Sequence, residues 1–210
     1  MTILYDISPP ISPTLAVWPG DTPPSREVLL ELSRGDSVTL STLHATVHLG
    51  AHADAPSHYG AGSADIAARP VDRYLGPCEV MRVPVQRGQR VTTSMLPRMV
   101  RAPRLLLATG TFPDPAHFNQ DFAALAPELV DALHDAQVSL VGIDTPSVDL
   151  FASKDLPAHQ RCLAHDLAIL EGLVLTNVPE GSYELIALPL PLVGFDASPV
   201  RAVLRASRSP

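Results

Sequence analysis

The chain has 210 residues, of which 46% are hydrophobic and 5% aromatic, and its formal net charge is −7. This length and apolar content fit one globular domain over residues 1–210 and exclude an intrinsically disordered protein. The acidic balance disfavours nucleic acid as a partner, because nucleic acid is bound by clustered Lys and Arg. No apolar run reaches the roughly 20 residues that are needed to span a bilayer.

In chain order, Thr2–Ser8 predicts a strand, and a long proline-rich loop with the only tryptophan, Trp18, follows it. Short apolar stretches rich in Val, Ile and Leu then recur, with lengths and flanking residues typical of strands. These stretches are Glu27–Leu32, Ser37–Leu43, Cys78–Val85, Arg104–Ala108, Val138–Ile143, Leu173–Val178, Tyr183–Leu190 and Val200–Arg205. Helices are fewer. Pro127 suits the first position of one helix, and a second is expected to begin at Pro157. The pattern predicts a mixed α/β domain with more strand than helix.

The start of the chain lacks the basic residues and apolar core of a signal peptide. The two cysteines, Cys78 and Cys162, form neither a C-x-x-C pair nor a zinc-finger spacing. We expect both to be buried, reduced thiols. These features predict a cytoplasmic protein.

The segment that follows Ser41-Thr42 is the most informative part of the chain. Its odd positions from Leu43 to Ala55 are all apolar, whereas imidazoles and a carboxylate occupy even positions. These even-numbered polar residues are His44, His48, His52 and Asp54. A period of two is typical of an extended chain with one buried face. The segment therefore places several metal-ligand side chains on the other face. His44 lies further back along the chain, and we expect it to be structural.

Extended backbone would separate His48 from His52 by about 13 Å, which is too far for both to bind one metal ion. The chain must therefore bend between them, and Gly50 is the residue that can adopt a positive φ. His52 and Asp54 can converge without a bend, and His58 follows in a loop. Three histidines and an acid so close together predict a metal site, whereas a lone histidine on a strand would not.

A segment nearer the C-terminus contains two more histidines and an acid. On spacing alone, His159 and His165 are equally suitable as ligands. One unbroken helix would hold His159 and Glu171 about 18 Å apart, so both can bind one site only if the helix breaks near His165 and Asp166. Otherwise Glu171 is a solvated residue before Gly172, which would end the helix.

The motif H-x-G-A-H-x-D-A-P-x-H at positions 48–58 resembles the signature of the cyclase-like metal-dependent hydrolases. The resemblance covers nearly the whole chain and is closest to the bacterial kynurenine formamidases (arylformamidases). Further matching segments are Asp6–Ser8, Val17–Asp21, Gly142–Asp149, Leu170–Leu173, Val178–Leu185, Ala187–Leu190 and Asp196–Arg205. Ala51 stands where the wider family often has Thr, a difference that fits the formamidase branch.

The resemblance implies a single-domain swivelling β/β/α cyclase-like fold, with a mixed sheet and few helices, and a homodimer. It also implies two divalent metal ions per subunit. Zinc is expected first, and the mixed nitrogen and oxygen ligands also suit manganese or cobalt. The implied metal ligands are His48, His52, Asp54, His159 and Glu171. His58 would be the catalytic acid/base, and Trp18 would contact the substrate.

The implied reaction is hydrolysis of N-formyl-L-kynurenine to L-kynurenine and formate in tryptophan catabolism. A related amide or lactam hydrolase, similar to isatin hydrolase, would share every ligand and differ only in its pocket. A non-catalytic metal-binding protein is a third alternative, although structural zinc usually has four Cys or His ligands. A serine hydrolase is disfavoured because the chain has no G-x-S-x-G motif. Ser147, between Asp144 and Asp149, is instead expected to shape the dimer or the rim of the site.

Overall fold

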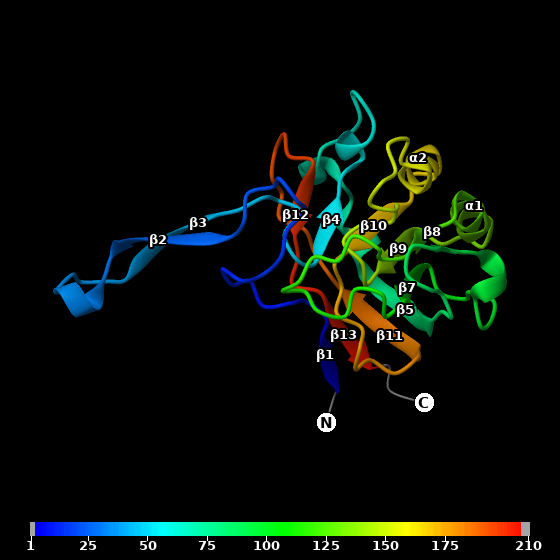
Figure 1. Cartoon of the computed structure of the whole chain (residues 1–210), viewed down its shortest axis with the longest axis horizontal. Helices are drawn as coiled ribbons and strands as arrows, with labels where there is room; N and C mark the ends of the chain where they lie inside the picture. The colour runs from blue at the N-terminus through cyan, green and yellow to red at the C-terminus, as the bar shows by residue number, and fades with distance from the viewer. Residues whose placement is uncertain (1–2, 207–210) are drawn as a thin grey trace.

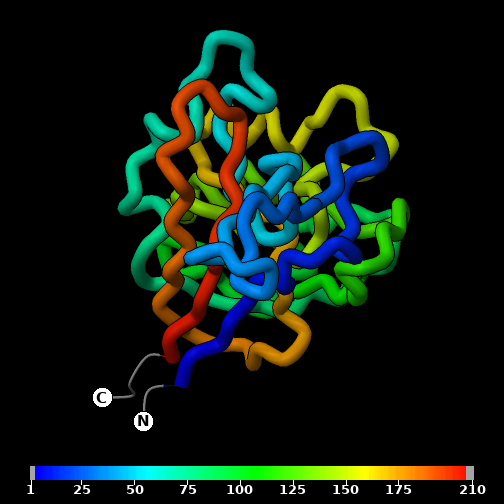
Figure 2. Tube along the Cα trace, turned by 90° about the vertical axis from the view of Figure 1, so that its left-hand side faces the viewer, coloured from blue at the N-terminus to red at the C-terminus, as the bar shows by residue number. Residues whose placement is uncertain are grey.

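The computed structural model describes residues 3–206, which form a single domain built on one nine-stranded sheet. Its strands are β1 (Leu4–Asp6), β4 (His52–Asp54), β5 (Leu75–Arg82), β7 (Arg104–Ala108), β9 (Leu140–Ile143), β10 (Ala168–Glu171), β11 (Gly181–Ile186), β12 (Ala197–Pro199) and β13 (Val203–Ala206). They lie in the order β1-β13-β11-β5-β7-β9-β10-β4-β12. The central pairs β5–β7, β7–β9 and β9–β10 are parallel, and the outer pairs are antiparallel. The first and last strands, β1 and β13, lie side by side (Figure 2).

Within residues 3–206 there are two α-helices, α1 (Pro127–Asp135) and α2 (Pro157–Ala164), and both lie on one side of the sheet (Figure 1). The short strands β6 (Arg90–Val91) and β8 (Ala124–Leu125) form a separate parallel pair. The 3-10 turns are η1 (Leu32–Arg34), η2 (Pro56–His58), η3 (Ile66–Ala68), η4 (Val71–Tyr74) and η5 (Thr93–Met95). The expected mixed α/β domain with few helices is confirmed. No helix in this described range is long and apolar enough to cross a membrane.

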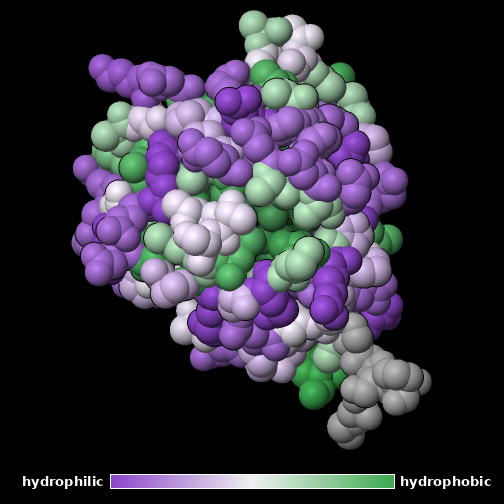
Figure 3. All heavy atoms as spheres, turned by 90° about the vertical axis from the view of Figure 1, so that its right-hand side faces the viewer, coloured by the Kyte–Doolittle hydropathy of each residue, from purple (hydrophilic) through white to green (hydrophobic). Residues whose placement is uncertain are grey.

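Two hydrophobic clusters cover the two faces of the central strands. Along β7, Leu105 and Leu107 belong to the cluster that includes Leu129 of α1, whereas Leu106 belongs to the opposite cluster with Leu170. Alternate residues of a strand face opposite ways, so strands that are buried on both sides are apolar throughout. On the helix-bearing side, the surface outside the core is mainly hydrophilic around a small apolar patch (Figure 3).

An antiparallel hairpin of β2 (Ser25–Leu30) and β3 (Leu40–His44) projects from the body (Figure 1). We call residues 25–44 the arm. Its leucines are exposed, with 51% of Leu29 and 61% of Leu43 accessible to solvent. The prediction that Leu43 lies on a buried face is therefore wrong, because nothing within residues 3–206 covers the apolar side chains of the arm.

Most predicted strands overlap an observed one, and Arg104–Ala108 matches β7 residue for residue. The helix at Pro127 also forms as predicted. The prediction of a strand at Leu173–Val178 is wrong. Its apolar side chains are buried in the core as a loop, after a Gly172 with φ of 66° that ends β10. At the N-terminus the strand is shorter than predicted, and Thr2 lies outside the described residues.

Candidate metal centre and pocket

Strand β4 carries two of the predicted ligands and lies between β10 and β12. In its register with β10, His52 lies opposite Glu171 and Asp54 lies opposite Ile169. Directly opposite residues of antiparallel strands project to the same face, as do residues two apart on one strand. The sheet therefore brings His52, Asp54 and Glu171 together. All three are buried, with exposed fractions of 3%, 1% and 3%.

Two glycines form the bend that precedes β4. Gly50 has φ of 57° and Gly172 has φ of 66°. A Cβ atom on Gly172 would lie 2.1 Å from the carbonyl oxygen of Gly50, so the two backbones touch where no side chain fits. The bend predicted at Gly50 is confirmed. It brings the ring centroids of His48 and His52 to 5.0 Å, well short of an extended separation.

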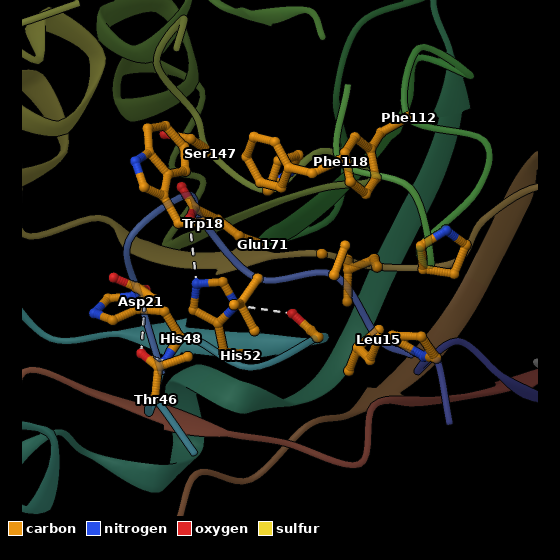
Figure 4. Close-up of a pocket in the computed structure, with 18 of the residues that line it drawn as sticks. Leu15, Trp18, Asp21, Thr46, His48, His52, Phe112, Phe118, Ser147 and Glu171 are labelled. Atoms are coloured by element: carbon orange, nitrogen blue, oxygen red, sulfur yellow. Dashed lines mark hydrogen bonds and ion pairs between the residues drawn. The ribbon is translucent and has the colours of Figure 1, made fainter. Parts of the chain in front are cut away.

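The ring of His52 is oriented by its own backbone. Its Nδ1 atom donates a hydrogen bond to the carbonyl oxygen of Gly50 at 2.9 Å. The Nε2 atom is then 3.5 Å from Asp54 Oδ1. It is also 3.3 Å from Glu171 Oε2 (Figure 4). A histidine fixed through one ring nitrogen presents the other as a metal ligand.

His159 is oriented in the same way by a buried carboxylate. Its Nδ1 atom lies 2.9 Å from Asp149 Oδ2, and its Nε2 atom lies 3.4 Å from Asp54 Oδ2 and 3.5 Å from Glu171 Oε1. Asp149 also accepts hydrogen bonds from the backbone N–H groups of Ala158 and His159 at the start of α2. Although burial raises the pKa of Asp149, hydrogen bonds from its partners hold it below the ordinary value.

Helix α2 ends at Ala164, and the chain turns at Asp166, whose φ is 50°. Strand β10 then carries Glu171 back toward His159. The expected break at His165 and Asp166 is confirmed, and it decides between the two histidines. His159 enters the site, whereas His165 contacts Asp131 at 2.7 Å near the surface.

His48 and His58 share a carboxylate that the sequence analysis did not single out. One oxygen of Asp196 lies 3.1 Å from His48 Nε2 and 3.2 Å from His58 Nδ1. The other ring nitrogen of His48 is 3.2 Å from Asp54 Oδ1. Burial disfavours the charged form of His48, but its close contacts with the carboxylates of Asp54 and Asp196 raise its pKa to about 9. A proton on this ring therefore holds the two acids together in the metal-free protein.

The centre contains buried polar atoms that no other part of the described chain satisfies. Within residues 3–206, His52 Nε2 and both carboxylate oxygens of Asp54 have no hydrogen-bond partner. Such atoms carry a free-energy penalty that a bound cation removes. The ligand atoms gather in two groups, each within 4.8 Å: His48, Asp54 and His58; and His52, Asp54 and Glu171. These nitrogen and oxygen donors fit divalent zinc, manganese or cobalt. His58 is thus close enough to be a ligand as well as an acid/base.

A cavity of about 470 Å³ opens onto this centre. Trp18 and Phe118 form part of its wall, with ring centroids 5.5 Å apart, and Phe112 lies 5.7 Å from Phe118 (Figure 4). Phe122 and Phe151 also contact Trp18. Four of the five phenylalanines in this aromatic-poor chain therefore gather in one cluster with Trp18. Aromatic faces of this kind form a flat apolar wall for an aryl ring.

Among the other predicted residues, Ser147 lines the cavity but its Oγ atom accepts a hydrogen bond from the backbone of Asp149. His44 forms an exposed ion pair with Glu27 on the arm and is not part of the site. Both cysteines are buried and free, as expected. The roles of Asp149, Asp196, Phe112 and Phe118 were not predicted from the sequence. The grouping of three phenylalanines between residues 112 and 122 was a usable signal for the aromatic wall.

Comparison with known proteins agrees with this architecture. A family model named Cyclase, with the description "Putative cyclase", matches residues 5–150. Because this match spans more than half of the chain, the protein belongs to the cyclase family.

Two solved structures are each 29% identical to the chain. One is described as a "Potential Metal-Dependent Hydrolase With Cyclase Activity", with a TM-score of 0.85 and 100% of both chains covered. The other is a "predicted metal-dependent hydrolase from Bacillus stearothermophilus", with a TM-score of 0.81 and 98% of both chains covered. Isatin hydrolase A from Labrenzia aggregata has a TM-score of 0.82 at 19% identity, covering 99% of this chain and 94% of its own, and shares the fold.

Proposed function

We propose that this chain is a metal-dependent arylformamidase that hydrolyses N-formyl-L-kynurenine to L-kynurenine and formate. The observation that carries the proposal is the position of the unpartnered buried atoms of His52 and Asp54. His52 lines one cavity together with Trp18 and Phe118, and Asp54 Oδ1 lies 3.5 Å from its Nε2 atom. An aryl formamide needs both features, a cationic centre for the formyl group and a flat apolar surface for the ring.

Two divalent ions, zinc first, would be held by the five predicted ligands. These are His48, His52, Asp54, His159 and Glu171. Bound ions of this kind lower the pKa of water and withdraw electrons from a carbonyl group. Asp54 is prepared for this role. Burial raises its pKa, but the rings of His159 and His48, at 3.4 and 3.2 Å from its oxygens, keep that pKa well below its ordinary value.

The side chains around the ions would do the remaining work. Trp18 and Phe118 orient the aryl ring. His58 donates a proton to the aniline nitrogen as the C–N bond breaks, a contribution of roughly 10²–10⁴-fold. Asp196 contacts His58 through Nδ1, which leaves Nε2 for the substrate. No covalent acyl-enzyme is required.

The test is release of kynurenine from N-formyl-L-kynurenine by the purified protein, with and without a chelator. Turnover that chelation abolishes and zinc or manganese restores is the expected result. Isatin is assayed in parallel, because isatin hydrolases share this fold. Hydrolysis of isatin alone would replace the proposed substrate with a lactam. Stoichiometric metal without turnover of either compound would favour a non-catalytic metal-binding protein.

We also propose that the protein is a homodimer in the cytoplasm, where Cys78 and Cys162 stay reduced. An isolated two-stranded hairpin is marginally stable in water, and the arm exposes Leu29, Leu32 and Leu43. A second copy that covers these leucines would stabilise the arm. Sedimentation of the wild type and of a Leu32→Asp, Leu43→Asp variant tests this proposal. A wild-type monomer would contradict it.

A further inference from the structure

The lining of the cavity is acidic. Within residues 3–206, neither Lys nor Arg lines it, whereas four carboxylates do. These are Asp21, Asp144, Glu171 and Asp196. A substrate that enters this cavity therefore meets no cationic side chain outside the metal centre. A positively charged group on the substrate can be matched by a carboxylate, but a negatively charged one cannot be matched by a side chain.

Three of the four carboxylates already have partners. Asp144 accepts hydrogen bonds from Thr109 and Gly110 and thereby fixes the start of the loop that carries Phe112. Glu171 and Asp196 contact the histidines of the centre.

Asp21 and Asp196 each have only their Oδ2 atom engaged, but their partners differ. Asp196 contacts two histidine rings, whereas Asp21 accepts a hydrogen bond only from the neutral Thr46 hydroxyl, at 3.3 Å. Within the described range, Asp21 Oδ1 has no hydrogen-bond partner. Asp21 is thus the cavity carboxylate that contacts no histidine ring and also keeps an oxygen for a cationic ligand.

Backbone contacts fix where Asp21 stands. A turn in which the Asp21 N–H donates to the Trp18 carbonyl at 2.9 Å places both side chains on the cavity. The Thr46 hydroxyl that contacts Asp21 also accepts a hydrogen bond from the backbone N–H of His48 at 3.3 Å. Asp21 therefore stands at the metal end of the cavity, away from Phe112 (Figure 4).

This position matches the chemistry of an ortho-substituted aryl formamide. In N-formyl-L-kynurenine the side chain leaves the ring beside the formamide nitrogen and ends in an ammonium and a carboxylate. A protein side chain that binds the end of this substituent must therefore lie next to the metal centre, and Asp21 lies there. We propose that Asp21 binds the ammonium group of the substrate, so that the site selects aryl formamides whose ortho side chain carries an ammonium group. This inference rests on the proposed function.

The experiment compares three analogues whose ortho acyl chains share the CO–CH2–CH2 unit and end in an ammonium, a hydrogen or a carboxylate. They are N-formylkynuramine (ammonium), 2-formamidopropiophenone (neutral) and 4-(2-formamidophenyl)-4-oxobutanoate (carboxylate). KM and kcat are measured for the metal-loaded wild type, for Asp21→Asn and for Asp155→Asn. The last variant removes an equal charge from an exposed position next to the cavity residue Leu156. We expect the wild type to favour the cationic analogue, and Asp21→Asn to raise KM for that analogue by about 10–100-fold. The neutral analogue should keep its kcat and KM, and Asp155→Asn should behave as the wild type.

Equal losses for the cationic and neutral analogues in Asp21→Asn would overturn the inference, because they would show that Asp21 supports the metal centre through Thr46. Wild-type preference for the carboxylate analogue would overturn it as well. If no aryl formamide is hydrolysed, the proposed function fails, and binding of kynuramine and 2-aminopropiophenone is measured by calorimetry. Tighter binding of kynuramine that Asp21→Asn abolishes would still support the ammonium site, and equal binding would reject it.

Discussion

Two groups of histidines and aspartates in this molecule share a composition but not an environment. One is the metal centre around Asp54. The other lies between α1 and α2, where the rings of His134 and His165 stack at 4.1 Å and His165 Nε2 contacts Asp131 at 2.7 Å. The side chain of Asp131 is 38% exposed and that of Asp54 is fully buried.

The difference shows which property makes such a group a candidate site. On the surface, water and a direct partner satisfy the polar atoms, so the His134–His165–Asp131 group needs no cation. At the centre, His52 Nε2 and the Asp54 oxygens are buried without a hydrogen bond, and leaving them so is costly. Residue type alone would rank the two groups together. Unmet hydrogen-bonding capacity separates them.

The largest expected effect comes from removing the charge of Asp54, the residue that belongs to both ligand groups. Asp54→Asn keeps the side-chain shape but replaces one oxygen with a donor that cannot bind a cation. We expect the variant to lose its metal, and turnover to fall by more than the roughly 100-fold loss that follows a change in a residue behind the ligands. Asp131→Asn, the matched change on the surface, should alter neither. Metal content by mass spectrometry and kynurenine release measure both. A metal-loaded, active Asp54→Asn protein would remove Asp54 from the site.

The next effect separates catalysis from metal binding. His58→Ala should keep its metal and lose about 10²–10⁴-fold in kcat, because the leaving nitrogen then lacks its proton donor. His134→Ala is the surface control and should keep full activity. His58 also stands within 4.8 Å of His48 and Asp54 as a possible ligand. Loss of metal from His58→Ala would therefore assign it to that ligand group.

The residues of the first ligand segment could be predicted because their pattern is local. The alternation, the position of Gly50 and the closeness of His52 to Asp54 depend on neighbouring residues. The choice between His159 and His165 does not. The turn that ends α2 is fixed by Asp166, whose carboxylate contacts Arg69 and Arg73 at 2.7 and 2.6 Å, residues far away in the sequence.

The arm shows that a local pattern is also insufficient to predict burial. Alternating apolar residues predict two different faces, but they do not say whether anything covers the apolar one. Leu43 continues the alternation of the ligand segment, yet it is 61% exposed because it lies on the projecting hairpin. The strand prediction at Leu173–Val178 fails for the opposite reason. This segment is an irregular loop, but it packs into the core and is therefore as apolar as a buried strand.

A smaller effect should follow from the carboxylate behind His159. Asp149→Asn retains an acceptor for the ring but loses the charge that orients and polarises it. Residues in this position contribute about 10–100-fold to metal affinity, and we expect a loss of that size. Titration with a zinc indicator measures it. Unchanged affinity would show that α2 alone positions His159.

Stability and metal affinity should both depend on pH through His48 of the metal centre. Because the pKa of His48 in the metal-free protein is raised to about 9, its charged contacts stabilise the fold fully below pH 6.5, the ordinary histidine value. That contribution is lost as pH rises through 9. Metal competes with the same proton, so its affinity should rise over this interval. Melting of the chelated protein at pH 6.5 and 9, and zinc affinity at both, check the two signs. Affinity that falls with pH would contradict proton competition at His48.

The smallest effect is expected from His165→Ala, and it sharpens the comparison because His165 follows the helix that carries His159. Its contact with Asp131 is partly exposed, and such surface pairs contribute about 0–1 kcal/mol. We expect urea denaturation to show a stability loss of at most about 1 kcal/mol, with unchanged metal content and turnover. Loss of metal would mean that the surface contact holds α2 in place and, through α2, positions His159. The two groups would then be one coupled unit, and exposure would no longer separate a structural histidine from a functional one.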